Sequence, residues 1–507
     1  MKHNKKIYSL NTLGSKIALL KSQGNTIILC HGVFDLLHIG HIKYFEEAKS
    51  FGSTLIVTIT PDRFVNKGPE RPIFSEKHRA EAIAALGSVD YVSINEWPTA
   101  IETIKLIEPD FYVKGPDYKD YKTDITGNIK LEEDATMAYG GKMAYTSGIT
   151  FSSSSLINLR FSNLNEDQIT FIEKIKEKYT FNEITEYFEK LNKLKILIVG
   201  EVIIDEYIFC DTIGKSGKEP VLVSKKGETK RYAGGILAAS NQVSDFCKDG
   251  KILSYLGESQ EQNKFIEESL GTNITFDFIN KSNSPTILKT RFIDNYTKSK
   301  TFGVYDMNDE LLNEDEDAKL CSKIDNCIED YDLVIVVDYG HGLITPKVVN
   351  LLEKKSRYLA INTQLNSSNV GYHSVSKYHS ADYVCIHEGE LRHDYRNRND
   401  TLEHLVRDLS KRINSDSILI TRGNKGSVCF DNFEFTYCPA YAINVVDRVG
   451  AGDTLFAITA LCLKAQLPKD LTLLIGNLAA AEMVASIGTG MKLNKVTLLK
   501  GLESLLK

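Results

Sequence analysis

The chain opens with a regular alternation of apolar runs and amphipathic stretches. Short runs rich in β-branched residues lie at 26–30, 54–60 and 110–115, among others, and apolar residues recur at helical spacing between them. This rhythm of strand and helix is typical of a parallel α/β sheet. It gives way to residues 159–193, whose helical spacing without a strand signal predicts a helical connector.

A second alternation fills the rest of the chain. Apolar runs at 195–205, 332–340 and 416–423 predict further parallel strands, followed by a helix-rich C-terminal part. Between these runs, 220–234 and 286–306 have the pattern of antiparallel strands and predict a small lid sheet. Because 507 residues are too many for one ordinary core, the expected fold class is α/β with more than one domain.

The composition is that of a globular protein. Apolar residues make up 42% of the chain and charged residues 25%, and the formal net charge of −6 provides no basic field for nucleic acid or an anionic membrane. No apolar run reaches the roughly 18 residues that span a bilayer, and no signal peptide is recognisable, so a cytoplasmic location is expected. The nine cysteines form no CxxC pair and are expected to be reduced core residues.

Two histidines stand where the first strand turns into a helix. The run 26–30 leads into a segment from His31 to His41, in which His38 and His41 flank Gly40. A helix N-terminus offers free N–H groups and a positive dipole end, and glycine lets the backbone approach a phosphate closely. We expect both imidazoles to donate to an α-phosphate as negative charge builds on it. A four-residue motif such as that from His38 to His41 also arises by chance in loops, so it indicates function only together with other motifs in the sequence.

Further motifs follow in the order seen in cytidylyltransferase-like nucleotidyltransferases: VNKGPERPIF, HRAEAIAAL, VDYV, YVKGPDY and FSSSSLI. Together they most resemble the adenylyltransferase domain of the bifunctional bacterial heptose kinase/adenylyltransferases. The resemblance implies that the triphosphate and the incoming sugar phosphate are held, with Mg²⁺, by Asp35, His38, His41 and Lys67. It implies further nucleotide or phosphate contacts by Gly32, Phe34, Gly40, Arg79, Lys114, Ser152, Ser153 and Ser154. Taken singly, Lys67 and Arg79 are better explained as solvated surface charges, and the serines could serve only as a helix N-cap.

A glycine-rich turn precedes a convincing helix near the C-terminus. The string from Asp447 to Asp453 reads DRVGAGD, and Gly450, Ala451 and Gly452 would present N–H groups to a transferring γ-phosphoryl group. Asp453 is placed to accept the proton of an attacking sugar hydroxyl. For an isolated GAG, close packing is the better explanation.

The longer string DxxGAGDTLFA resembles the signature of ribokinase-like (PfkB) sugar kinases, and the likeness extends over about residues 195–507. It implies a sugar site at Asp205, Gly234 and Gly235 and an ATP site at Thr421, Gly423 and Gly426. It also implies that Glu390 orders Mg²⁺ and phosphate. The sequence departs from the family at His387, where an Asn begins the motif that ends at Glu390.

Two basic residues in the predicted lid suggest a phosphorylated substrate. Lys289 and Arg291 lie in the stretch PTILKTRF and are suited to grip a second anionic group, such as the phosphate of a sugar phosphate. A solvated strand edge is the alternative reading of the same pair.

The two resemblances divide the chain into a Rossmann-like nucleotidyltransferase at 1–158, a connector at 159–193 and a ribokinase-like kinase at 194–507. In the heptose enzymes the kinase comes first, so the order here is reversed. We expect ATP-dependent phosphorylation of a sugar or a heptose-7-phosphate-like sugar phosphate. We also expect transfer of a nucleotide from ATP or CTP to a sugar or polyol phosphate, with release of pyrophosphate. The alternative is a CTP-dependent cytidylyltransferase for a polyol phosphate whose kinase domain has a different or regulatory role.

The expected partners are sugar phosphates, nucleoside triphosphates and Mg²⁺, with neither nucleic acid nor membrane. Kinases of this kind often pair through their lid strands, which is compatible with a homodimer. The HIGH string at 38–41 also occurs in class I aminoacyl-tRNA synthetases. That assignment is disfavoured, because no KMSKS-like segment follows and the acidic balance offers little for tRNA.

Overall fold

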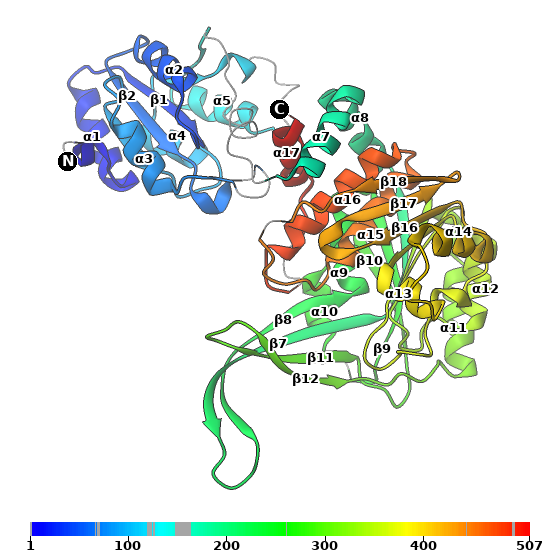
Figure 1. Ribbon diagram of the computed structural model, residues 1–507. Helices are drawn as coiled ribbons and strands as arrows, with labels where there is room; N and C mark the ends of the chain where they lie inside the picture. The colour runs from blue at the N-terminus through cyan, green and yellow to red at the C-terminus, as the bar shows by residue number, and fades with distance from the viewer. Residues whose placement is uncertain are drawn as a thin grey trace. The chain divides into compact units, whose positions relative to one another are not determined.

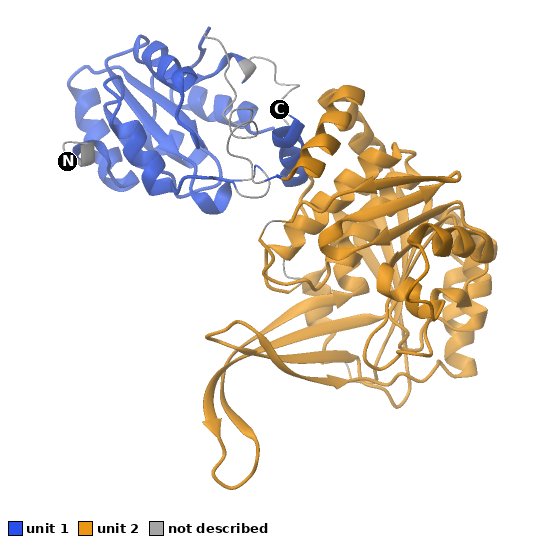
Figure 2. Ribbon diagram, viewed as in Figure 1, with its two compact units in different colours: residues 1–164, 496–507 blue, residues 165–495 orange. Residues whose placement is uncertain are grey.

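The protein divides into two units, which Figure 2 shows in separate colours. Unit 1 comprises residues 1–164 and 496–507, and unit 2 comprises residues 165–495. The structure is a computed structural model that describes residues 3–65, 67, 71–118, 124, 127–147, 164–259, 261–442, 444–488 and 492–506. Helices α7 (Glu166–Lys178) and α8 (Phe181–Leu191) of the expected connector are counted in unit 2.

Unit 1 contains a sheet of five parallel strands in the order β3-β2-β1-β4-β5 (Figure 1). The chain starts in the middle of the sheet, extends it on one side and then returns to the other side of β1. The strand order therefore reverses between β1 and β4, and in open α/β sheets ligands bind at the carboxyl ends of strands at such a point. The strands are β1 (Ile27–Gly32), β2 (Thr54–Ile59), β3 (Tyr91–Ile94), β4 (Phe111–Lys114) and β5 (Lys142–Tyr145).

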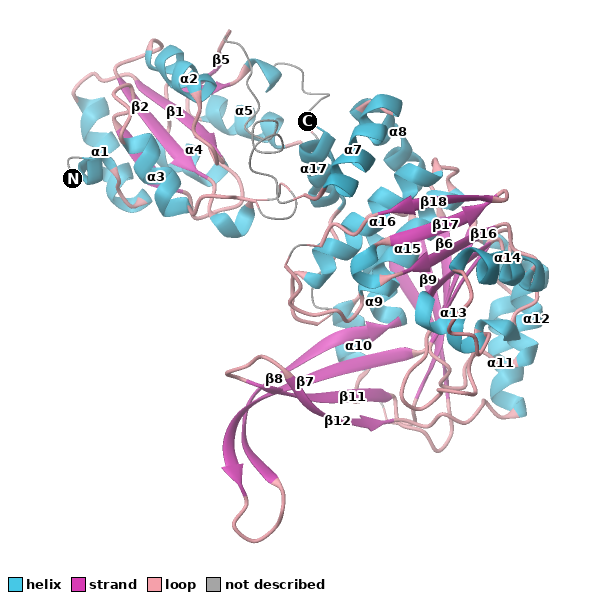
Figure 3. Cartoon of the chain, in the orientation of Figure 1, coloured by secondary structure: helices cyan, strands magenta, loops and turns pink. Residues whose placement is uncertain are grey.

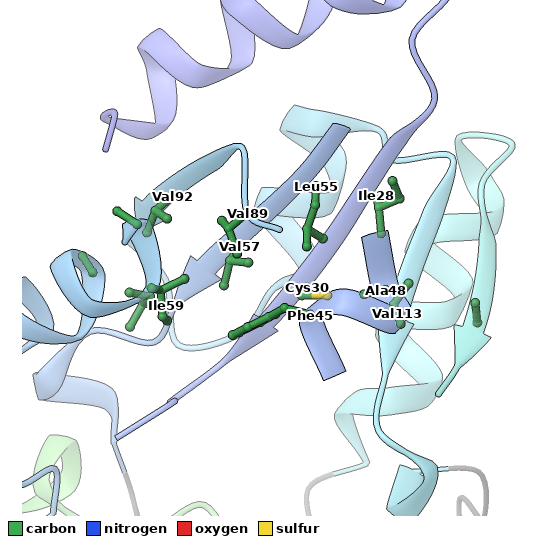
Figure 4. Close-up of a cluster of buried hydrophobic side chains, with 14 residues drawn as sticks. Ile28, Cys30, Phe45, Ala48, Leu55, Val57, Ile59, Val89, Val92 and Val113 are labelled. Atoms are coloured by element: carbon green, nitrogen blue, oxygen red, sulfur yellow. The ribbon is translucent and has the colours of Figure 1, made fainter. Parts of the chain in front are cut away.

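Helices cover both faces of this sheet, which is why its central strands are continuous apolar runs rather than alternating ones. On one face, Phe45 and Ala48 pack with Cys30 and Val57 in a fully buried cluster (Figure 4). On the other face, the apolar sides of α1 and α4 pack against β1 and β2. The helices of unit 1 are α1 (Leu10–Ser22), α2 (Ile39–Lys49), α3 (Glu76–Ala84), α4 (Ile101–Ile107), α5 (Asn128–Ala138) and, apart from its first residue, α17 (Lys495–Leu506).

Unit 2 is built on a nine-stranded sheet in the order β10-β9-β6-β13-β14-β15-β16-β17-β18. Seven strands are parallel, β17 is antiparallel to β16, and β18 again runs in the direction of β16. The order reverses between β6 and β13, so the carboxyl ends of both strands meet at a second switch point. The strands are β6 (Lys195–Gly200), β9 (Asp249–Leu256), β10 (Ile274–Asn280), β13 (Leu333–Asp338), β14 (Leu359–Thr363), β15 (Tyr383–His387), β16 (Ser417–Thr421), β17 (Ser427–Asp431) and β18 (Glu434–Cys438).

A second sheet in unit 2, β12-β11-β7-β8, is the expected lid, and Figure 3 shows its β7–β8 ribbon extending from the main sheet. β7–β8 and β11–β12 pair antiparallel as expected, whereas β7 and β11 pair in parallel. The apolar run 195–205, expected as one strand, is divided between the two sheets. At Gly200 a Cβ atom would lie 2.2 Å from the carbonyl oxygen of Val337, so the chain leaves the main sheet at a close backbone contact. The lid strands are β7 (Val202–Lys215), β8 (Leu222–Gly235), β11 (Ile287–Asp294) and β12 (Lys300–Asp306).

The helices of unit 2 hold the functional turns in place. α15 is buried over nearly its whole length and packs against α16 and α9. α7 and α8 each begin with a reciprocal capping box, which satisfies backbone N–H groups at both helix starts. The helices other than α7 and α8 are α9 (Ile236–Ser244), α10 (Asn263–Ser269), α11 (Glu314–Asp325), α12 (Pro346–Lys355), α13 (Glu388–Asp394), α14 (Leu402–Ile413), α15 (Ala451–Lys464) and α16 (Lys469–Val484).

The α/β class expected from the sequence is confirmed in both units. The nine cysteines are unpaired, and seven of them are buried, as expected for reduced core residues. Within the residues that the structure describes, no helix is sufficiently long and apolar to span a bilayer.

The packing of α2 against the sheet predicts a specific loss of stability. Phe45 is 0% exposed, so Phe45→Ala should lower the unfolding free energy of unit 1 by about 3–5 kcal/mol, because it leaves a cavity. Trp97, the one tryptophan of the chain, lies in unit 1, and its fluorescence during urea denaturation follows that unit. Leu19→Ala, at a position 59% exposed, is the control and should change stability by less than about 0.5 kcal/mol. Equal losses would contradict the packing.

Two candidate active sites

The first candidate site lies where β1 passes into α2. His38 is the N-cap residue of α2, and its Nδ1 accepts a hydrogen bond from the backbone N–H of Gly40 at 3.1 Å. The ring of His41 stacks on that of His38, with centroids 4.0 Å apart. The structure thus brings the two predicted histidines together at a helix N-terminus, with Gly40 between them.

The aromatic ring of Phe34 packs against the histidine pair. The backbone of Phe34 is left-handed, with φ of +49°, and its ring meets His41 edge-on at 5.4 Å. A Cβ atom on Gly32 would lie 2.9 Å from this ring, so the glycine leaves the space that Phe34 occupies. These contacts give both residues a supporting role, and the nucleotide contacts expected of them stay predictions.

Both imidazoles are neutral at neutral pH. Burial lowers the pKa of His38. Burial is also the main reason that the pKa of His41 is lowered to about 3, and the nearby Lys67 ammonium adds to this lowering. A neutral imidazole has one N–H donor and one acceptor nitrogen. Because Nδ1 of His38 accepts from Gly40, its proton is on Nε2.

Two buried charged residues hold the loop that follows β1. The carboxylate of Asp35 accepts hydrogen bonds from the backbone N–H groups of Ile73 at 2.9 Å and Phe74 at 3.0 Å. Arg79, which is 1% exposed, donates to the carbonyl oxygens of Phe74 and Val33. The loop is therefore pinned to the start of α3, and the expected phosphate contacts of Asp35 and Arg79 stay predictions.

The remaining residues of the first site have different surroundings. Lys114 ends β4 at the switch point and is 8% exposed, and its Nζ lies 2.9 Å from the Glu132 carboxylate. Burial opposes its charge, yet Glu132 leaves the pKa of Lys114 raised. Lys67 is close enough to His41 to affect its pKa. Ser152, Ser153 and Ser154 lie outside the described residues.

The second candidate site is at the N-terminus of α15. Gly450 is the N-cap residue with φ of +82°, a conformation that favours glycine, and the N–H groups of the first turn are open to an anion. Oδ2 of Asp453 accepts a hydrogen bond from the hydroxyl of Tyr339 at 3.0 Å. Its Oδ1 is buried and has no hydrogen-bond partner in the part of the chain that the structure describes.

The environment of Asp453 suits a proton acceptor. Burial raises the pKa of Asp453 to about 6, against the lowering effect of the Tyr339 hydrogen bond. The nearby charge of Asp205 adds to the rise. A carboxylate with a pKa close to neutral and one unsatisfied oxygen has the properties of a general base.

A pocket of about 1090 Å³ extends from Asp453 along the carboxyl ends of β14, β15 and β16. Its volume suits a nucleotide. The predicted ATP-site residues meet on its wall, with Gly450 directly before the lining residues of α15. The predicted residues that line the pocket are Thr421, Gly423 and Gly426 after β16, and Ala451 and Gly452 in α15.

Glu390 lines the same pocket from the first turn of α13. Its two oxygens accept hydrogen bonds from the backbone N–H groups of Leu365 at 2.9 Å and His387 at 2.7 Å. Nδ1 of His387 accepts in turn from the N–H of Gly389 at 3.0 Å, so the imidazole takes the N-cap role for which Asn is also suited. The departure at 387 therefore preserves the cap. Burial raises the pKa of Glu390 to about 7.

The predicted sugar-binding residues gather where the lid strands leave the main sheet. The carboxylate of Asp205 on β7 pairs with the guanidinium of Arg291 on β11. A Cβ atom on Gly234 would lie 2.4 Å from that carboxylate, and one on Gly235 would lie 2.5 Å from the carbonyl oxygen of Glu201. Both glycines are required by the close approach of β7 and β8.

Lys289 is 7% exposed and belongs to a buried chain of polar groups. Its Nζ is 3.1 Å from Nε2 of His341, whose Nδ1 is 2.6 Å from the Asp309 carboxylate. Burial lowers the pKa of Lys289. The ammonium also lies 5.8 Å from the ring centre of Tyr339, the residue that donates to Asp453.

The expectations from sequence omitted Tyr339 and His341. Both belong to the string DYGHG at residues 338–342. The available signal was their position directly after the apolar strand β13, because polar residues that follow a parallel strand lie at its carboxyl end. Their partners on β11 and α15 are far away in the sequence.

Comparison with known proteins identifies both halves. The cytidylyltransferase-like model matches residues 29–159, and the pfkB family carbohydrate kinase model matches residues 193–495. Bifunctional protein HldE of Aliarcobacter butzleri is 42% identical over 133 residues, which are 25% of this chain and 28% of that protein. Bifunctional protein HldE of Campylobacter jejuni subsp. doylei is 28% identical over 306 residues, which are 60% of this chain and 63% of that protein. Each match therefore spans less than two thirds of the relative.

Among solved structures, a ribokinase from Thermotoga maritima matches with 18% identity and a TM-score of 0.49, over 61% of this chain and 99% of that chain. The two families expected from the sequence are confirmed by the two matches, and the kinase match covers more than half of the chain. The chain belongs to the pfkB family of carbohydrate kinases and carries a cytidylyltransferase-like domain on the N-terminal side of the kinase.

Proposed function

We propose that this protein is a bifunctional enzyme of nucleotide-sugar synthesis. A kinase within residues 194–507 phosphorylates the anomeric hydroxyl of a sugar or sugar phosphate with ATP. A nucleotidyltransferase within residues 1–158 transfers a nucleotide from ATP or CTP to a sugar or polyol phosphate and releases pyrophosphate. Residues 159–193 connect the two, and both activities belong to a homodimer in the cytoplasm, where nucleoside triphosphates are supplied.

The observation that carries the kinase assignment is the unsatisfied, buried Oδ1 of Asp453 beside the open N–H groups of α15. The sugar hydroxyl oxygen attacks the γ-phosphorus in line, its proton passes to Asp453, and the bond from that phosphorus to the ADP oxygen breaks. Gly450, Ala451 and Gly452 stabilise the charge on the transferring group through backbone N–H groups.

The transferase needs no protein nucleophile. An oxygen of the sugar phosphate attacks the α-phosphorus, and the bond from that phosphorus to the pyrophosphate oxygen breaks. The neutral imidazoles of His38 and His41 donate N–H groups to the α-phosphate oxygens, where negative charge increases. Lys67 and Lys114 attract the triphosphate to the switch point of the sheet, and Ser152 to Ser154 complete the nucleotide contacts.

Mg²⁺ is the metal that both reactions require, and the donor groups fit an ion carried by the nucleotide. In the described part of the chain, no three His, Cys, Asp or Glu residues form a metal cluster. Mg²⁺ bound to a nucleotide commonly takes only one or two carboxylates and fills its other positions with phosphate oxygens and water. Glu390 in the kinase pocket would supply such a carboxylate. The ion would neutralise phosphate charge during transfer.

Lys289 and Arg291 favour a substrate with a second anionic group. Both side chains are largely buried at the lid, next to Asp205, and a phosphate can take up their charge where an uncharged sugar cannot. A heptose-7-phosphate-like substrate satisfies this requirement, with its anomeric hydroxyl at Asp453.

The two reactions should be separable by single substitutions. Asp453→Asn should lower the kinase kcat by about 10²–10⁴-fold, because the base is lost, and leave pyrophosphate release unchanged. His41→Ala should lower pyrophosphate release by about 10²–10³-fold and leave the kinase unchanged. The measurement is turnover of both variants with ATP and CTP against heptose 7-phosphate, heptose 1-phosphate and simple sugar phosphates. A wild-type protein that performs neither reaction would overturn the assignment.

The pKa of Asp453 predicts the pH dependence of the kinase. The base must be ionised, so activity should fall about tenfold per pH unit below about pH 6 and level off above it. The Tyr339 hydrogen bond lowers this pKa, so Tyr339→Phe should move the profile to higher pH while keeping the ring. Rate profiles of wild type and variant test the assignment, with pyrophosphate release as the control that should not shift. Superimposable kinase profiles would contradict it.

A further inference from the structure

The connector between the two domains reaches the nucleotide pocket of the kinase. Asn165, Asp167 and Gln168, at the start of α7, line the same pocket as Glu390 and Asp453. All of these residues belong to unit 2. The beginning of α7 is therefore part of a pocket wall.

Several hydrogen bonds hold this turn against the pocket. Asn165 and Gln168 form the reciprocal capping box of α7. Gln168 is largely buried, and its Nε2 donates to the carbonyl oxygen of Ala440 at 2.5 Å. The backbone carbonyl oxygen of Gln168 accepts a hydrogen bond from the hydroxyl of Tyr441 at 3.3 Å. Ala440 and Tyr441 also line the pocket, and Tyr441 is 1% exposed. The turn is thus fixed to a buried segment of the kinase rather than resting on its surface.

The strand order indicates which end of the pocket α7 borders. Asp453 accepts a hydrogen bond from Tyr339, which lies directly after β13. Ala440 lies two residues after β18. β18 runs in the direction of β16, so both strands end at the same sheet edge. Five strand spacings separate β13 from β18, on the order of 24 Å. With the transferring phosphate at Asp453, α7 lies at the opposite, nucleoside end.

One side chain of this turn is available for a ligand. Asp167 is exposed, and within the residues that the structure describes its carboxylate makes no hydrogen bond or ion pair. A carboxylate accepts hydrogen bonds, and a nucleoside offers such donors in its ribose hydroxyls and in the exocyclic amino group of adenine. Gln168 fixes the turn that carries this carboxylate.

We propose that the first turn of α7 recognises the nucleoside of ATP in the kinase pocket, with Asp167 as the contacting residue and Gln168 as a positioning residue. The proposal rests on the assignment of this pocket to ATP. It makes the connector a determinant of nucleotide affinity in addition to a link between domains.

The test compares Asp167→Ala with Glu166→Ala in the full-length protein. Glu166 is the neighbouring acidic residue in the same turn, is exposed and does not line the pocket. ATP affinity is read from the slowing of amide hydrogen exchange in peptides that contain Gly450–Asp453, which reports on the kinase pocket and requires no turnover. Asp167→Ala should weaken ATP binding about 10–150-fold, the value of one hydrogen bond to a charged group, and Glu166→Ala should not.

Inorganic tripolyphosphate provides the second arm, because it has the phosphates of ATP without the nucleoside. Its binding should be the same in wild type and Asp167→Ala. Titrations with 2′-deoxy-ATP and GTP distinguish a contact to the ribose hydroxyl from a contact to the adenine amino group. If Asp167 contacts the ribose, the affinity of Asp167→Ala should be the same for ATP and 2′-deoxy-ATP. If it contacts adenine, the ratio of ATP to GTP affinity should be smaller in the variant than in the wild type. Unchanged ATP binding, or equal weakening of ATP and tripolyphosphate, would overturn the proposal.

The kinase assignment fails separately. A wild-type protein whose Gly450–Asp453 peptides are protected by ATP, but which phosphorylates no sugar, would overturn the proposed function while the affinities still decide the role of Asp167. Absence of any protection by ATP would overturn the role of α7 itself. Gln168→Ala tests positioning: KM for ATP should rise while kcat is retained, and a parallel fall of kcat with loss of thermal stability would contradict it.

Discussion

Both sites depend on parallel strands that end at a common sheet edge. A parallel strand leaves its last residues at the same edge as its neighbours, so loops that are distant in the sequence meet there. In unit 1 this edge carries the turn after β1 and Lys114 at the end of β4, on either side of the switch point. In unit 2 it carries Tyr339, His387 and Thr421 at the ends of three strands. Each site follows from the position of that edge.

Several buried charges in unit 2 are paired with an opposite charge. Asp205 pairs with Arg291, and Asp338 pairs with Lys377 at 2.5 Å. Burial of a charge without such a partner is costly, which is why these buried charges occur as pairs. Oδ1 of Asp453 has no such partner among the described residues. An unsatisfied buried oxygen raises the free energy of the resting site, and transfer of a proton from substrate relieves that cost.

Hydrogen bonds connect the lid strands to the turn that precedes α15. Asp447, the first residue of DRVGAGD, accepts hydrogen bonds from Lys300 on β12 at 2.7 Å and from Tyr207 on β7 at 3.2 Å. The N–H of Gly488 donates to the same carboxylate at 3.1 Å. The position of the lid strands is therefore coupled to the backbone that leads into Gly450.

The sequence by itself determined the α/β class, the lid, the two families and most candidate residues, because these depend on local periodicity and on strings in which contributing residues are neighbours. His38 with His41, and Gly450 with Asp453, are close in the chain and needed no long-range contact to be recognised. Only the tertiary structure decided that Asp35 and Arg79 bind the backbone of a neighbouring loop. It also showed that Glu390 accepts a hydrogen bond from the N–H of His387 and that Tyr339 donates one to Asp453. It also divided the run 195–205 between two sheets and placed α7 on the pocket wall. The physical reason is that such contacts join residues from distant strands and helices, and periodicity contains no information about which of those elements become neighbours.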